Sequence, residues 1–117
     1  AERRSQEQNR QVAIGRLRLL LAVRIRSVGN AEVNPSVLWQ SRCRQQKIGC
    51  NEHHDDFPVM IAEALDAIDA KEFDVKKAAA ALGCSTSQLV RFIAIVPEAL
   101  VAVNAERMSR GLHRLLP

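Results

Sequence analysis

Apolar residues recur at three- and four-residue steps along most of this chain, the spacing that places them on one face of an α-helix. The first such run consists of Ile14, Leu17, Leu21, Ile25 and Val28. Ser5 and Gln8 before the run have the spacing of a capping box, and Gly29-Asn30 after it is a stop signal. The pattern predicts a helix over residues 6–28, roughly 34 Å long. Because a small domain needs no helix of that length to cover its core, we expect it to pack against something outside this chain.

Four further helices are predicted in the C-terminal half, the first running from residue 57 to about residue 70. The residues expected at helix ends are the N-cap candidates Asp56, Asp74 and Ser85, the first-turn residue Pro97, and the stop residues Gly83 and Gly111. The residues expected to face inward are Phe57, Met60, Ile61, Ala64, Leu65, Ile68, Ala78, Ala79, Leu82, Leu89, Phe92, Ile93, Val96, Leu100, Val103 and Met108. These elements predict a compact helical module.

The segment between these parts is weakly patterned. Asn34-Pro35 favours the start of a short helix over residues 35–46, which we expect Trp39 to hold against another element, and residues 47–56 are expected to form a loop. The predicted fold is therefore all-α. It has a long basic N-terminal helix (residues 1–28), a linker with a short helix (29–56), and a three- to four-helix module (57–117).

Residues 78–92, AAAALGCSTSQLVRF, have the pattern of a helix-turn-helix. Small Ala79 permits close approach of the helices, Gly83 turns the chain, and Leu82, Leu89 and Phe92 join the two helices. The pattern resembles the DNA-binding helix-turn-helix of transcription factors, whose second helix enters the major groove. The residues expected to point outward from that helix, and then to contact bases, are Ser87, Gln88 and Arg91. The same geometry also packs three short helices in proteins that bind no nucleic acid, so a protein-interaction module is an alternative.

The overall composition agrees with the predicted globular fold. The chain has 117 residues, 47% of them hydrophobic and 26% charged, which is typical of a single globular domain. Arginines close the apolar run of residues 19–23 on both sides, so no run approaches the ~18 residues of a membrane helix. We expect no membrane association.

Charge is distributed unevenly along the sequence. Residues 1–56 carry ten Lys or Arg against six Asp or Glu, whereas residues 57–117 carry seven of each. The first 26 residues contain seven arginines, no lysine and only two glutamates. Such a density of guanidinium groups suits a phosphate backbone. The zero net charge of the C-terminal module lacks the electrostatic signature of a DNA-binding protein.

The candidates for metal binding and catalysis are weak. Three cysteines build no disulfide framework and favour a reducing compartment, so we expect the protein in the cytoplasm. Zinc sites usually pair their ligands more closely than Cys43, Cys50, His53 and His54 are spaced, and we expect no metal and no cofactor. Cys84 precedes a predicted helix N-terminus, where a thiol pKa can be lowered, but we favour a structural role. No catalytic constellation is evident.

Residues 4–13, RSQEQNRQVA, carry a second resemblance. They are similar to the R-S-Q-x-x-N-[RK]-x-x-A signature that follows the catalytic loop in the peptidyl-tRNA hydrolase domain of bacterial class I peptide chain release factors. Residues 39–114 resemble the C-terminal extension of release-factor-like proteins. The resemblance implies a role in translation and contact with ribosomal or transfer RNA. The residues expected at that contact are Arg3, Arg4, Gln6, Asn9, Arg10, Arg16 and Arg18.

One departure from this family limits what the resemblance implies. Release factors carry their chemistry on a Gly-Gly-Gln loop placed before the signature, and this sequence contains no Gly-Gly pair. No catalytic residue is therefore carried over, and we expect no ester hydrolysis by this chain. It is either part of a longer gene product with an N-terminal hydrolase half or a protein that kept only a binding role. A DNA-binding regulator and a protein-interaction module are the alternatives.

Overall fold

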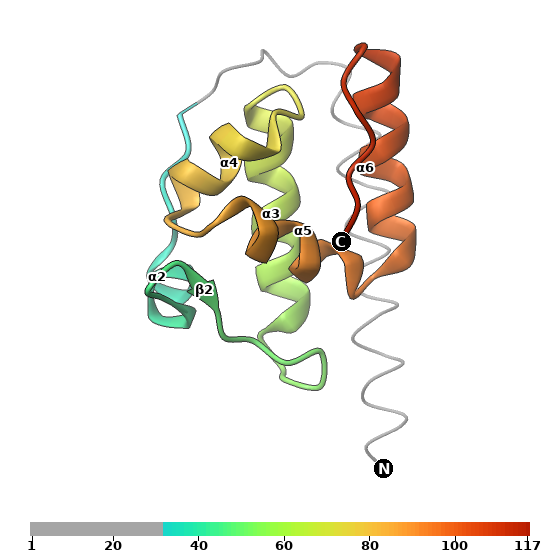
Figure 1. The fold of residues 1–117 in the computed structure, drawn as a ribbon. Coiled ribbons are helices and arrows are strands. Elements are labelled where there is room, and N and C mark those ends of the chain that lie inside the picture. Colours follow the sequence, from blue (N-terminus) through green and yellow to red (C-terminus); the bar gives the residue numbers. More distant parts are fainter. Residues whose placement is uncertain (1–31) are drawn as a thin grey trace.

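The computed structural model of the chain describes residues 32–117, which are mostly helical (Figure 1). Its elements are helices α2 (Val37–Arg42), α3 (Phe57–Ala70), α4 (Val75–Leu82), α5 (Thr86–Ala94) and α6 (Pro97–Ser109), and strands β1 (Cys43–Arg44) and β2 (Lys47–Ile48). The two strands form an antiparallel hairpin. The predicted helical class is thus confirmed, and the two-residue strands of the hairpin are a small feature that the prediction did not include. The helix expected over residues 6–28 lies outside the described residues.

Helices α3 and α5 lie at the centre of the packing. Helix α3 contacts α2, α4 and α5, while α5 also contacts α4, α6 and strand β2. The α3 residues predicted to face inward are all buried, and the Phe57 ring lies edge-on to that of Phe92 on α5, with centroids 5.6 Å apart. Trp39 of α2 is fully buried and also makes an edge contact with Phe92 at 6.1 Å. The prediction that Trp39 holds the short helix on another element is confirmed.

The helix-turn-helix has the expected turn. The Asp74 side chain accepts a hydrogen bond from the Lys77 N–H and caps α4, and the Ser85 side chain caps α5 by accepting from the Gln88 N–H. Gly83 ends α4 in the left-handed conformation, with φ of +78°. A residue with a side chain adopts this conformation at a cost of about 1–2 kcal/mol, so glycine is favoured at this position.

The short helix differs from its prediction at both ends. It spans six residues, Ser36 caps it in place of Asn34, and it ends at Arg42. It ends there because Cys43 is extended, with φ of −110° and ψ of 108°, and begins strand β1. Gln45 and Gln46, with φ of +52° and +65°, then form the two-residue hairpin loop. Residues 47–48, predicted as loop, are therefore strand β2.

Helix α6 corrects one prediction and confirms another. Met108, expected to face inward, is 63% exposed. Gly111 has φ of +75° and follows the helix end, as its predicted role as a stop residue requires. Beyond it, the Asn104 side chain exchanges two hydrogen bonds with the backbone of Leu115, which holds the C-terminal segment against α6.

Candidate nucleic-acid interface

The three residues predicted to face outward from the helix-turn-helix have two different roles. Ser87 and Arg91 are exposed and lie four positions apart, and therefore on one face of α5. Gln88 is half-buried, and its Oε1 accepts a hydrogen bond from the Ile48 N–H at 3.2 Å. The expectation that Gln88 points outward is wrong, because its amide is engaged by strand β2.

The hairpin is fixed against the start of α5. Besides the bond to Gln88, the Gln46 carbonyl accepts from the Ser85 N–H at 3.1 Å, and the Cys43 Sγ donates to the Gly83 carbonyl at 3.3 Å. In a complete capping box the Gln88 side chain would accept a hydrogen bond from the Ser85 N–H. In this structure the Gln88 side chain and the Ser85 N–H each bind the hairpin instead. The N-terminal end of α5, which a DNA reader places in the major groove, is therefore partly covered.

The hairpin that is hydrogen-bonded to the start of α5 carries two exposed basic residues, and sequence reasoning missed both. Arg44 and Lys47 lie directly opposite each other across the strands, and both are exposed. Neither residues 33–51 nor residues 75–97 contain a carboxylate, although the described range holds eleven. Because residues 57–117 carry equal numbers of acidic and basic residues, their net charge does not show that residues 75–97 lack carboxylates. The absence of Asp and Glu from these two stretches is the sequence signal that could have identified the basic residues.

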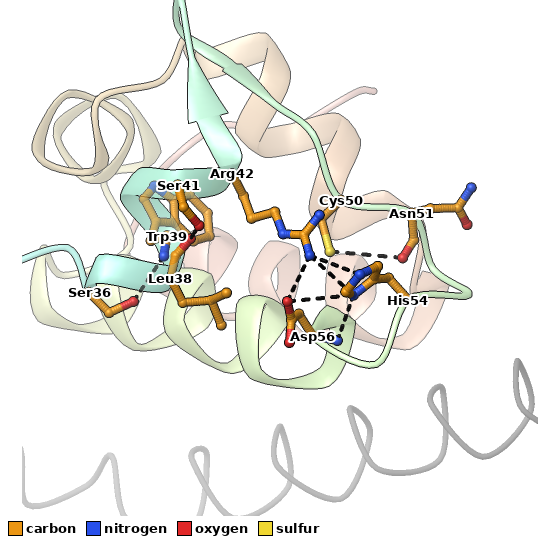
Figure 2. A network of polar contacts seen from close by, with 9 residues as sticks. All are labelled: Ser36, Leu38, Trp39, Ser41, Arg42, Cys50, Asn51, His54 and Asp56. Atoms are coloured by element: carbon orange, nitrogen blue, oxygen red, sulfur yellow. Dashed lines mark hydrogen bonds and ion pairs between the residues drawn. The ribbon is translucent and has the colours of Figure 1, made fainter.

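A polar network fixes the loop between the hairpin and α3 (Figure 2). The Arg42 guanidinium donates to the Asp56 carboxylate at 2.9 Å and lies 2.8 Å from the His54 Nε2. The Asp56 N–H lies 3.0 Å from the His54 Nδ1. Asp56 occupies the N-cap position of α3 but makes no side-chain capping bond, which corrects the prediction for that residue. Its carboxylate binds Arg42 instead and ties α2 to the start of α3.

The cysteines and histidines singled out in the sequence do not converge. Cys43 points toward the Gly83 carbonyl and Cys50 toward the Asn51 carbonyl, while His54 belongs to the Arg42 network. Within residues 32–117, no group of three or more His, Cys, Asp or Glu is arranged to hold a metal ion. In the same range no helix is long and apolar enough to cross a membrane.

Burial raises the pKa of the Cys84 thiol to about 12, and the neighbouring Cys43 adds a smaller increase. The pKa values of Cys43 and Cys50 are also raised, in both cases mainly by burial. The lowered thiol pKa considered for Cys84 is therefore wrong, because burial raises the pKa more than the backbone hydrogen bond to the thiol lowers it.

We expect Cys84 to resist alkylation in the folded chain. A rise from the ordinary value of 9.0 to about 12 lowers the reactive thiolate fraction at pH 8 by about a thousandfold. Iodoacetamide followed by peptide mass spectrometry checks this, with the same protein in 8 M urea as control. Modification of Cys84 at equal rates in both conditions would contradict the burial.

The residues predicted to bind RNA, Arg3, Arg4, Gln6, Asn9, Arg10, Arg16 and Arg18, all lie outside the described residues. Comparison of the chain with protein-family models, with curated proteins and with solved structures finds no match.

Proposed function

We propose that this chain works in translation, in the cytoplasm, as the C-terminal part of a release-factor-like protein that binds ribosomal or transfer RNA. The observation that carries the proposal is the segment RSQEQNRQVA at residues 4–13, placed within a stretch of seven arginines and no lysine. Guanidinium groups pair with phosphate oxygens through two parallel hydrogen bonds, which makes an arginine-rich segment suited to an RNA backbone.

Within this proposal the N-terminal residues divide into two groups. Arg3, Arg4, Arg10, Arg16 and Arg18 contact phosphates, and the side-chain amides of Gln6 and Asn9 add hydrogen bonds to riboses or bases. Because the sequence contains no Gly-Gly pair, the chain by itself supplies RNA contact and not peptidyl-tRNA hydrolysis.

A DNA-binding regulator is the second candidate, favoured by the exposure of Ser87 and Arg91 on one face of the second helix of a helix-turn-helix. Against this candidate, Gln88 is bound to the hairpin, which leaves two of the three expected base-reading side chains at the surface.

One pair of binding assays separates the candidates. We expect the intact chain to pellet with ribosomes at low salt and to be released as salt rises, because phosphate contacts release counterions. Repeated selection from random-sequence duplex DNA is expected to enrich no sequence. Enrichment of one sequence by the intact chain, lost in Ser87→Ala with Arg91→Ala, would replace the translation proposal with the regulator.

A further inference from the structure

We propose that the outer face of the β1–β2 hairpin and the exposed face of α5 form a second RNA-binding surface, which contacts phosphate groups of a folded RNA. This hairpin surface comprises Arg44, Lys47, Ser87 and Arg91. The inference rests on the proposed function, since it assigns part of the RNA contact to residues within the described module.

The register of the hairpin places its two charges on the outer face. Cys43 pairs with Ile48, and both are half-buried, while Arg44 pairs with Lys47, and both are exposed. Like charges directly opposite each other on two strands destabilise the pair. Residues 33–51, which include both strands, contain no carboxylate that could pair with either charge from within the hairpin. An anion bound between the two side chains would relieve this repulsion.

The surface is also held in a defined shape. The hydrogen bonds from the Ser85 N–H to the Gln46 carbonyl and from the Ile48 N–H to the Gln88 Oε1 join the hairpin to the start of α5. A rigid surface loses little conformational entropy on binding.

The chemistry of the exposed groups fits phosphate. Arg91 presents a planar fork of donors and Lys47 a point charge, the types of side chain that contact nucleic-acid backbones. The exposed Ser87 hydroxyl shares a hydrogen bond with the Ser85 Oγ at 3.3 Å and is the weaker of the contacts. Arg42 is excluded, because its guanidinium is already bound to Asp56. Because the hairpin partly covers the N-terminal end of α5, the surface suits contact with a folded RNA backbone better than insertion into the major groove of DNA.

The neutral double variant Arg44→Gln with Lys47→Gln tests the surface. Removing two phosphate contacts is expected to lower the slope of log affinity against log salt by roughly 1.4–1.8, measured by filter binding of the full chain to bulk transfer RNA. Thermal stability is expected to stay the same or to rise, because the cross-strand repulsion is removed. Weaker binding by a protein of unchanged or greater stability is a result that loss of folding cannot produce.

A matched control variant also removes two positive charges, at positions outside the hairpin surface. Lys76 and Arg114 are exposed, and Lys76 lies in the first turn of α4, at the opposite end from the Gly83 turn that the hairpin contacts. Lys76→Gln with Arg114→Gln is expected to leave the slope nearly unchanged.

Three results would overturn the hairpin surface: a slope equal to that of the intact chain in the hairpin variant, an equal loss in the control, or a loss seen only with random-sequence duplex DNA. If the intact chain itself binds no RNA, the proposed function fails together with the surface. If the intact chain binds RNA and the hairpin variant binds equally well, the surface alone fails.

Discussion

Replacing Trp39 with alanine is expected to lower the free energy of unfolding of the described module by about 4–8 kcal/mol. The side chain is fully buried, its Nε1–H donates to the Leu82 carbonyl at 2.9 Å, and its ring packs edge-on against Phe92. Truncating a buried tryptophan costs about 3–5 kcal/mol, and leaving a buried carbonyl without a partner adds about 1–3 kcal/mol. Single domains are stable by only about 5–15 kcal/mol, so the loss takes a large share of the total.

Two further variants separate the loss of ring packing from the loss of the hydrogen bond in Trp39→Ala. Trp39→Phe keeps an aromatic ring but removes the N–H, and is expected to lower the free energy of unfolding by about 1–3 kcal/mol. Val37→Ala, on the same helix at a position that is 83% exposed, is expected to change stability by less than about 0.5 kcal/mol. Because Trp39 is the chain's only tryptophan, urea unfolding should be followed by circular dichroism at 222 nm. Trp39→Ala with the same midpoint as Val37→Ala would contradict the packing of α2.

Helix ends in the module could be predicted because their signals are local. Asp74 and Ser85 cap the helices that follow them, and Gly83 and Gly111 take the left-handed conformation that a helix stop requires. Each of these residues acts on backbone groups within a few positions of itself. Sequence spacing is sufficient to predict such contacts.

The hairpin could not be predicted, for two physical reasons. Its strands are two residues long, too short to show an alternating pattern, and its turn uses Gln45 and Gln46 where Asn-Gly or Asp-Gly is the usual signal. The outward orientation predicted for Gln88 is wrong for a related reason. Its side chain binds the N–H of Ile48, forty positions away. Only the folded chain brings these two residues together.

The candidate interface was predicted in part. Ser87 and Arg91 follow from helical periodicity, which places both on the face away from Leu89 and Phe92. Arg44 and Lys47 join them only through the hairpin register and its hydrogen bonds to α5. A net charge counted over residues 57–117 could not reveal this surface, because two of its three cations lie before residue 57.

Reversing Arg10, Arg16 and Arg18 to glutamate is expected to abolish co-sedimentation with ribosomes. The change removes three phosphate contacts and places three carboxylates against the RNA backbone, while the formal net charge falls from +4 to −2. The matched control Lys71→Glu, Lys76→Glu, Arg114→Glu makes the same change in net charge at positions outside the proposed RNA contacts. We expect this control to keep most of the binding. Equal losses in the two triple variants would show a dependence on net charge alone.

The salt dependence of binding to bulk transfer RNA measures most directly whether residues 1–28 carry the RNA contact. For Arg10, Arg16 and Arg18 changed together to glutamine, we predict a slope of log affinity against log salt lower by roughly 2–3, since each lost contact removes about 0.7–0.9. The loss in affinity should exceed that of Arg91→Ala. An unchanged slope in the triple variant, or a larger loss of affinity in Arg91→Ala, would contradict the assignment of RNA binding to the N-terminal arginines.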